Sequence, residues 1–92
     1  MNKKIGVLLT LFVLQFVTVF AQKEYLLEAD NFFKGGQFVS AIDAYQRAYT
    51  RAKTTEEKGY ISFQLGECHR RAANPGKAEE FYQRCVELKY SN

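Results

Sequence analysis

The feature that most constrains this chain is an internal repeat with a period of 37 residues. Residues 25–49 (YLLEADNFFKGGQFVSAIDAYQRAY) align with residues 62–86 (SFQLGECHRRAANPGKAEEFYQRCV) at this constant offset. The tripeptide Tyr-Gln-Arg recurs, and small residues recur at three matched positions: Ala29 with Gly66, Ala41 with Ala78, and Ala48 with Cys85. A repeat of this length is typical of a helix–turn–helix unit in a helical solenoid. Because such proteins usually bind partners, the repeat favours binding over catalysis.

The first 22 residues differ in composition from the rest of the chain. Their only charges are Lys3 and Lys4, and an uncharged run follows that ends in Phe20-Ala21-Gln22. A basic start, an apolar middle and a small residue near the end are features of a secretory signal peptide, here residues 1–21, with cleavage after Ala21. A retained membrane anchor is the alternative, although 16 apolar residues span only roughly 24 Å as a helix against a hydrocarbon core of ~30 Å. We therefore expect export to the periplasm, with no membrane-spanning segment in the mature form.

The remaining 71 residues, 22–92, are close to neutral. The chain has 13 basic residues, and without the two lysines of the leader 11 stand against 10 acidic ones, a net charge of +1. This balance gives no electrostatic reason to expect nucleic acid or an anionic membrane as a partner. A segment of this length buries only a modest core.

The apolar pattern predicts four helices and no strand, which makes the fold class all-α. The expected helices cover residues 23–34, 38–52, 55–72 and 75–89. Gly35-Gly36 is expected to end the first helix, since glycine readily takes the left-handed conformation of a helix C-cap. Thr54 and Glu57 have the spacing of a capping box at the start of the third helix.

The second turn has its own signals, and the apolar faces follow from the spacing. Asn74 suits the N-cap of the fourth helix and Pro75 its first position. In the second helix, Tyr45 is expected on the apolar face, and in the third helix, Cys68 and His69 are expected to face inward. In the fourth helix, the apolar face is expected to contain Ala78, Phe81, Tyr82, Cys85, Val86 and Leu88.

These two units, residues 22–53 and 54–92, resemble tetratricopeptide repeats. The second unit carries the Leu-Gly pair, the alanine and the aromatic residue of that pattern at Leu65-Gly66, Ala78 and Tyr82. The first carries equivalents at Ala29, Phe32, Ala41, Tyr45 and Ala48. The closing proline is absent, His69 stands at an aromatic position, and the period exceeds the usual 34 residues. The resemblance implies two stacked repeats of a solenoid.

A second resemblance rests on the overall character of the chain. A leader that ends in Ala-Gln, followed by Lys-Glu-Tyr and two such repeats, is similar to the N-terminus of certain bacterial envelope proteins of the type IX secretion and gliding machinery. In that family the repeats precede a β-propeller and an OmpA-like peptidoglycan-binding domain. The resemblance implies an exported scaffold module, or alternatively a structural spacer at the N-terminus of a larger anchored protein with no ligand of its own.

The residues with reactive side chains give little support for catalysis. Cys68 and His69 are neighbours on a helix and point roughly 100° apart, so they do not form a nucleophile–base pair. Two cysteines and one histidine lack the fourth ligand and the spacing of a metal site. We therefore predict no enzymatic activity, no metal and no cofactor. Export favours a disulfide between Cys68 and Cys85, but the repeat geometry is expected to place their Cα atoms beyond the ~7 Å that a bridge tolerates, which favours two buried thiols.

The resemblance to tetratricopeptide repeats places the binding surface on a concave face formed by the first helix of each repeat. Carried onto this chain, these positions are Lys23, Leu26, Asp30, Phe33, Lys34, Tyr60, Phe63, Glu67, Arg70 and Arg71. The apolar members would contact a protein or peptide partner, and Lys34, Arg70 and Arg71 would bind a carboxylate; the alternative is a solvated face. Since two repeats leave apolar surface unshielded, a neighbouring domain or homo-oligomerisation is a further alternative.

Overall fold

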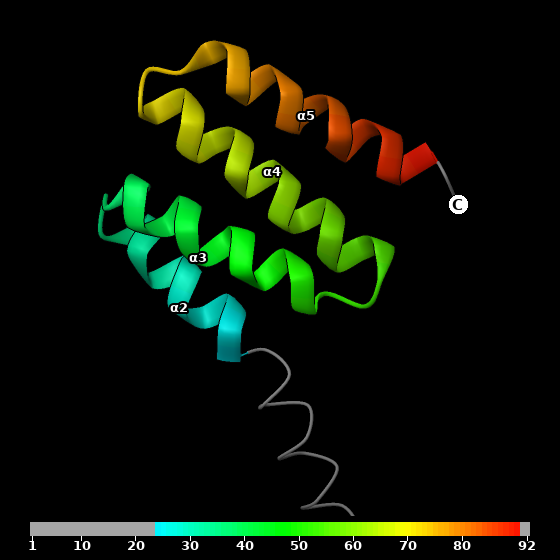
Figure 1. Ribbon diagram of the computed structural model, residues 1–92, viewed down its shortest axis with the longest axis horizontal. Helices are drawn as coiled ribbons and strands as arrows, with labels where there is room; N and C mark the ends of the chain where they lie inside the picture. Colours follow the sequence, from blue (N-terminus) through cyan, green and yellow to red (C-terminus); the bar gives the residue numbers. More distant parts are fainter. Residues whose placement is uncertain (1–23, 91–92) are drawn as a thin grey trace, which may run out of the picture.

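The structure is a computed structural model that describes residues 24–90, and these form four α-helices (Figure 1). Their bounds are Glu24–Lys34 for α2, Phe38–Arg51 for α3, Thr55–Arg71 for α4 and Pro75–Tyr90 for α5. No strand occurs in this part of the chain, which confirms the all-α fold class. The observed bounds agree with the expected ones within one residue wherever they can be compared. The predicted signal peptide lies outside the described residues.

The four helices lie side by side in the order of the sequence, with α2 at one edge and α5 at the other (Figure 1). Each helix packs mainly against its sequence neighbours, so that α3 contacts both α2 and α4, and α4 contacts both α3 and α5. Consecutive helices run in opposite directions (Figure 1). Within residues 24–90, α5 therefore has a packing partner on one side only.

The turn between α2 and α3 follows the predicted glycine C-cap. Gly36 has a φ of +76°, in the left-handed region that glycine adopts without strain. The amide of Gln37 donates to the carbonyl of Phe32 at 2.9 Å, and the amide of Gly36 donates to that of Phe33 at 3.1 Å. These two bonds form a Schellman motif, which satisfies the last carbonyls of α2. The tight turn makes α2 and α3 antiparallel neighbours.

The start of α4 shows the predicted N-cap. The hydroxyl oxygen of Thr54 accepts a hydrogen bond from the amide of Glu57 at 3.1 Å. The Glu57 carboxylate turns instead to the amide of Lys53 at 3.2 Å and to the hydroxyl of Tyr25 at 3.3 Å. The capping residue thus begins the helix, and the glutamate ties this turn to α2.

The end of α4 repeats the Schellman pattern without a glycine. Ala73 has a φ of +60°, and the amide of Asn74 donates to the carbonyl of His69 at 2.8 Å. The side chain of Asn74 then accepts a bond from the amide of Lys77 at 3.4 Å, which confirms it as the N-cap of α5. An alanine at this φ is strained, because its Cβ crowds the following carbonyl oxygen.

The core lies along the helix crossings where the repeat places its small residues. Ala29 and Ala41 have no exposed surface, and Ala48 has 1%. At the equivalent crossing of α4 and α5, a Cβ on Gly66 would lie 2.6 Å from a ring carbon of Tyr82. The glycine is therefore required by the close approach of this ring, and the small residues let the helices pack closely.

Three observations differ from the expected inward faces. Val86, expected on the apolar face of α5, is 46% exposed. His69 is half-buried and stacks against the ring of Phe81, with centroids 5.4 Å apart. Ser62 is fully buried, and its hydroxyl has no hydrogen-bond partner. The Val86 prediction was wrong because helical periodicity assigns it to an inward face whereas α5 lies at the edge of the layer.

Among the described residues, no helix has the length and apolar character needed to cross a bilayer.

Candidate partner-binding surface

The predicted binding residues lie on α2 and α4, the two helices that open the repeats. We call the nine of them within the described residues the α2–α4 strip; the tenth, Lys23, lies outside those residues. The strip consists of Leu26, Asp30, Phe33, Lys34, Tyr60, Phe63, Glu67, Arg70 and Arg71. Of its apolar and aromatic members, Tyr60 and Phe63 are the most exposed, at 43% and 47%. Leu26 and Phe33 are half-buried and pack against the core.

A shared carboxylate joins the two helices of the strip. Asp30 on α2 accepts hydrogen bonds through Oδ1 from the hydroxyl of Tyr45 on α3 and, at 2.8 Å, from the hydroxyl of Tyr60 on α4. The side-chain amide of Gln64 donates to the Tyr45 hydroxyl at 3.1 Å. Burial and the bond to Asp30 raise the pKa of Tyr45 and of Tyr60, so both phenols stay protonated and donate. The network therefore fixes the spacing between α2 and α4.

The second repeat contains the same pair 37 residues later. The hydroxyl of Tyr82 on α5 donates to Oε2 of Glu67 on α4, as Tyr45 does to Asp30. Glu67 also accepts two bonds from the guanidinium of Arg70, at 3.0 and 3.3 Å. These bonds, first from Arg70 and then from Tyr82, lower the pKa of the Glu67 carboxyl. The carboxylate is ionised at neutral pH and neutralises part of the charge of Arg70.

The three cations predicted to bind a carboxylate, Lys34, Arg70 and Arg71, differ in how far contacts within the protein already engage them. Arg71 lies 4.0 Å from Glu67 and stacks over the rings of Phe33 and Phe38, at 5.0 and 5.6 Å from their centroids. Stacking holds this guanidinium across the α2–α3 pair while leaving its side chain 45% exposed. Lys34 is exposed at the end of α2. The structure thus brings Arg71 close to Phe33, and it engages Arg70 with Glu67.

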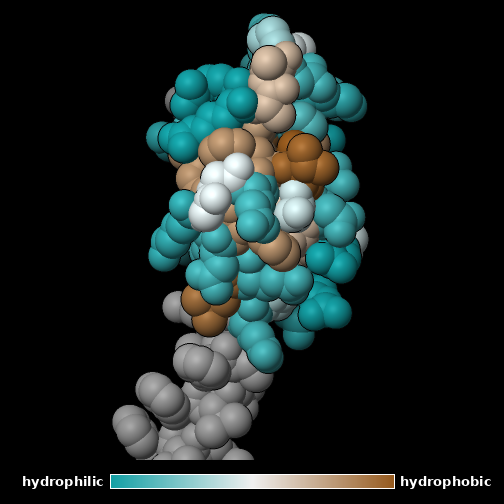
Figure 2. Space-filling view, turned by 90° about the vertical axis from the view of Figure 1, so that its left-hand side faces the viewer, coloured by the Kyte–Doolittle hydropathy of each residue, from teal (hydrophilic) through white to brown (hydrophobic). Residues whose placement is uncertain are grey.

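The end of the molecule that carries the α2–α3 and α4–α5 turns is largely hydrophilic. Figure 2 shows this end, where the apolar colours form separate patches between hydrophilic side chains. Such scattered patches are ordinary for a folded surface. The exposed aromatic members of the strip are Tyr60 and Phe63.

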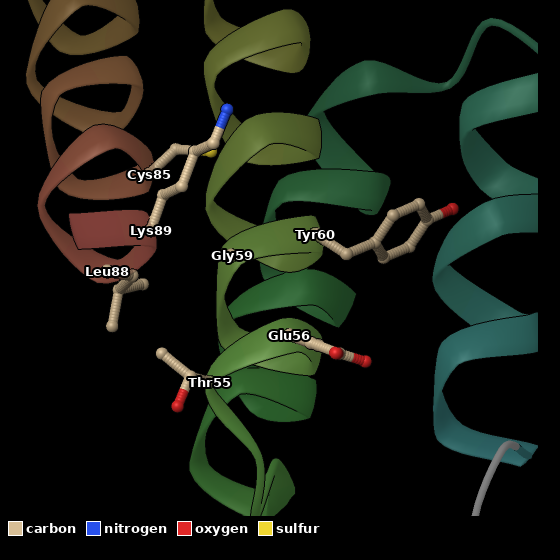
Figure 3. Close-up of a pocket in the computed structure, with 7 residues that line it drawn as sticks. All are labelled: Thr55, Glu56, Gly59, Tyr60, Cys85, Leu88 and Lys89. Atoms are coloured by element: carbon tan, nitrogen blue, oxygen red, sulfur yellow. The ribbon is translucent and has the colours of Figure 1, made fainter. Parts of the chain in front are cut away.

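A pocket of about 310 Å³ lies between the first turns of α4 and the last turns of α5. Its lining is Thr55, Glu56, Gly59, Tyr60, Cys85, Leu88 and Lys89. Figure 3 shows Glu56 and Tyr60 pointing from α4 toward α2, on the side of α4 away from Cys85. The pocket is thus a gap between two helix ends next to the strip.

The cysteines and the histidine are separate features of the packing. Cys68 has no exposed surface, and burial raises the pKa of its thiol to about 11. Cys85 is half-buried, and neither cysteine is in a disulfide. Burial lowers the pKa of His69, whose Nε2 has no hydrogen-bond partner beside the ring of Phe81. A protonated thiol and a neutral imidazole in these positions describe packed side chains.

Sequence reasoning missed the tyrosines that hold the strip together. Tyr45 and Tyr82 were assigned to the apolar core, although their hydroxyls bind the carboxylates of Asp30 and Glu67. A signal was present, since each carboxylate precedes its tyrosine by 15 residues in both repeats. Gln64 carried no comparable signal, because its partner lies on a different repeat.

Comparison with known protein families, with curated proteins and with solved structures finds no match in any of the three.

Proposed function

We propose that this chain is an exported protein-interaction module of the tetratricopeptide-repeat kind, acting in the bacterial cell envelope. Its partner, a protein segment, docks on the α2–α4 strip. The observation that carries this proposal is the pair of exposed aromatic side chains, Tyr60 and Phe63, on a strip whose helix spacing is fixed by the Asp30 network. Preorganised aromatic side chains are efficient contacts, because little conformational freedom is lost when a partner binds.

The polar part of the strip sets a second requirement for the partner. Arg71 is stacked and half-exposed, and Lys34 is exposed at the neighbouring helix end. A segment that places an apolar side chain on Phe63 and a carboxylate toward Arg71 would match both. Export of the module rests on the composition of residues 1–21 alone.

The test uses peptides selected from a random display library on the purified chain, each then measured by fluorescence anisotropy. We expect Phe63→Asp to weaken binding about tenfold or more, because a carboxylate replaces the apolar contact. Val39→Asp is the matched control, since Val39 is 77% exposed on α3 and lies outside the strip. Equal binding by the wild type and Phe63→Asp would refute docking on the strip.

A structural spacer without its own ligand is the second candidate. It is favoured by one observation, which is that Asp30 and Glu67 are already bonded to side chains of the chain itself. Carboxylates that serve the packing of the layer offer fewer groups for a ligand. Failure to select any peptide that distinguishes Phe63→Asp from wild type would support this function.

A further inference from the structure

Within residues 24–90, α5 lies at the edge of the layer, whereas its counterpart in the first repeat, α3, is covered by α4. The exposure of matched residues on the two helices can therefore be compared. At each of three matched positions the residue on α5 is more exposed than its counterpart on α3. Tyr45 has no exposed surface and Ala48 has 1%, whereas their counterparts Tyr82 and Cys85 are half-buried. Tyr49 is half-buried, whereas Val86 is 46% exposed. What α4 covers in the first repeat is therefore open in the second.

The hydrogen bonds show what the covering helix contributes. In the first repeat, α4 supplies the hydroxyl of Tyr60 to the carboxylate of Asp30 and the amide of Gln64 to the hydroxyl of Tyr45. These donors are four residues apart, one above the other on one face of α4. A helix that packs on such a carboxylate–tyrosine pair thus donates a hydroxyl to the carboxylate and an amide to the tyrosine, from side chains four residues apart.

The second pair retains room for such donors. Glu67 accepts one bond from Tyr82 and two from Arg70, and a carboxylate offers about four acceptor positions. Arg70 comes from the same helix as Glu67, and within residues 24–90 no helix follows α5. Because Oε2 already accepts both the Tyr82 hydroxyl and Arg70 Nε, the remaining acceptor position is on Oε1, which also lies 4.0 Å from the guanidinium of Arg71.

We propose that this flank is a docking site for one amphipathic helix of a partner protein. The flank consists of Phe63, Tyr82 and Val86, with Glu79 and Lys89 at its ends. The partner helix packs apolar side chains on Phe63 and Val86. It places hydroxyl and amide donors, four residues apart, on Glu67 and Tyr82.

Charges at the two ends of the flank define the partner further. Glu79 and Lys89 occupy the places of Ile42, which is half-buried on α3, and Ala52, which is 8% exposed. Ten residues separate them, roughly 15 Å along α5. A partner that runs antiparallel to α5, as α4 does to α3, meets Lys89 with its first turn and Glu79 with its last. It therefore carries acidic residues at its start and basic residues at its end, as its own helix dipole also favours.

A second copy of this chain is a poor fit to the flank. The helix it would present is α2, whose outward positions match those of α4 in the alignment. Glu24 and Glu28, both exposed, stand where α4 has the buried Ile61 and Leu65. Leu27 stands where α4 has the donor Gln64. Burial of these two carboxylates is costly, since only Glu28 has an ion-pair partner among the described residues, Arg47 at 3.7 Å, so head-to-tail stacking of copies is disfavoured.

The probe is a labelled peptide of residues 55–71 with Cys68 replaced by alanine, because it carries both donors and the required charges at its ends. Fluorescence anisotropy of this peptide is followed as the purified full chain is added. We expect saturable binding that Val86→Asp weakens about tenfold or more. Gln83→Asp places the same charge on α5 and is the control, since its counterpart Gln46 stays exposed even beneath α4. The same peptide with Tyr60→Phe and Gln64→Leu is expected to bind about fivefold more weakly or worse.

Three outcomes would overturn the proposal, provided that circular dichroism shows every variant to be folded. They are an absence of saturable binding, equal binding by wild type and Val86→Asp, and a wild-type dimer in sedimentation that Val86→Asp dissociates. The last would assign the flank to a second copy. The inference goes beyond the proposed function, because Val86 lies outside the α2–α4 strip. Phe63 and Glu67 belong to both surfaces, whereas Val86 belongs to the flank alone, so the effect of Val86→Asp on a bound peptide separates the two proposals.

Discussion

At Gly66, α4 and α5 approach closely, because the ring of Tyr82 fills the space of a side chain. A Cβ there would lie 2.6 and 2.7 Å from two ring carbons. The ring has little freedom to move away, since its hydroxyl is bonded to Glu67. The glycine is thus paired with its aromatic neighbour, and the repeat keeps both at the same offset as Ala29 and Tyr45.

We expect Gly66→Ala to lower the free energy of unfolding by about 1–3 kcal/mol, as an overpacked core does. Gly59→Ala is the control on the same helix, because a Cβ at that position meets no atom within 4 Å. There alanine is expected to stabilise the protein by about 0.5–1 kcal/mol through its helix propensity. Urea denaturation of both variants measures the two effects, and a neutral Gly66→Ala would show that the ring moves freely.

The Glu67 carboxylate links stability to pH. Hydrogen bonds from Arg70, and next from Tyr82, lower its pKa in the folded state. A lowered pKa contributes stability above the unfolded pKa, and this contribution is lost as the pH falls through the folded value. We therefore expect the stability gap between wild type and Glu67→Gln to narrow as the pH falls from about 6 to about 3.

Urea midpoints of the two proteins across this pH range measure the gap. Arg70→Gln is the control, because it removes the largest cause of the lowered pKa and should flatten the pH dependence. A gap that stays constant with pH would show that the Glu67 pKa is the same in the folded and unfolded chains.

Individual residues were predictable from sequence only where their role is local. The cap residues Thr54 and Asn74 follow from neighbours three residues away, and both were predicted. The bond between Tyr45 and Asp30 crosses two helices, so its partners depend on how the helices pack. Because helical spacing assigns a residue to a face and says nothing of the hydroxyl at its tip, Tyr45 was predicted only as apolar core.

Among the elements, α4 depends most clearly on its first turn. The Thr54 hydroxyl accepts the amide of Glu57, and the Glu57 carboxylate binds Tyr25 of α2. We expect Thr54→Ala to destabilise the protein by about 1 kcal/mol, the usual effect of losing an N-cap. Thr50→Ala is the control, because the Thr50 hydroxyl donates to the carbonyl of Arg47 on an exposed part of α3; its effect should stay within about 0.5 kcal/mol. Thermal unfolding followed by circular dichroism compares them, and equal effects would contradict a capping role.

Element ends were predictable in part. Gly35-Gly36 correctly predicted the end of α2. The helix α4 ends in the same backbone motif, but with Ala73 at a φ of +60°. No sequence signal marks an alanine for this conformation, because it is imposed by the turn between two packed helices. The exposure of Val86 is a similar case, since it depends on whether another helix covers α5.

For the whole molecule, the reaction rates of the two thiols distinguish local exposure from global unfolding. Cys68 has no exposed surface and a pKa raised by burial to about 11, whereas Cys85 is half-buried beside the pocket at the ends of α4 and α5. We expect iodoacetamide at pH 8 to modify Cys85 first, and Cys68 only at the rate of global unfolding. Mass spectrometry of the wild type and Cys85→Ser measures the rates. Modification of Cys68 as fast as of a free thiol would contradict the buried position.

The fold class and the order of the helices were predictable because the chain packs locally, each helix against its neighbours in sequence. This arrangement also determines how the protein responds to force. A load applied to the two ends of the described helices acts on contacts that open one after another, beginning at α2 or α5. The layer therefore peels helix by helix under low tension and behaves as a compliant spring between whatever its ends are attached to.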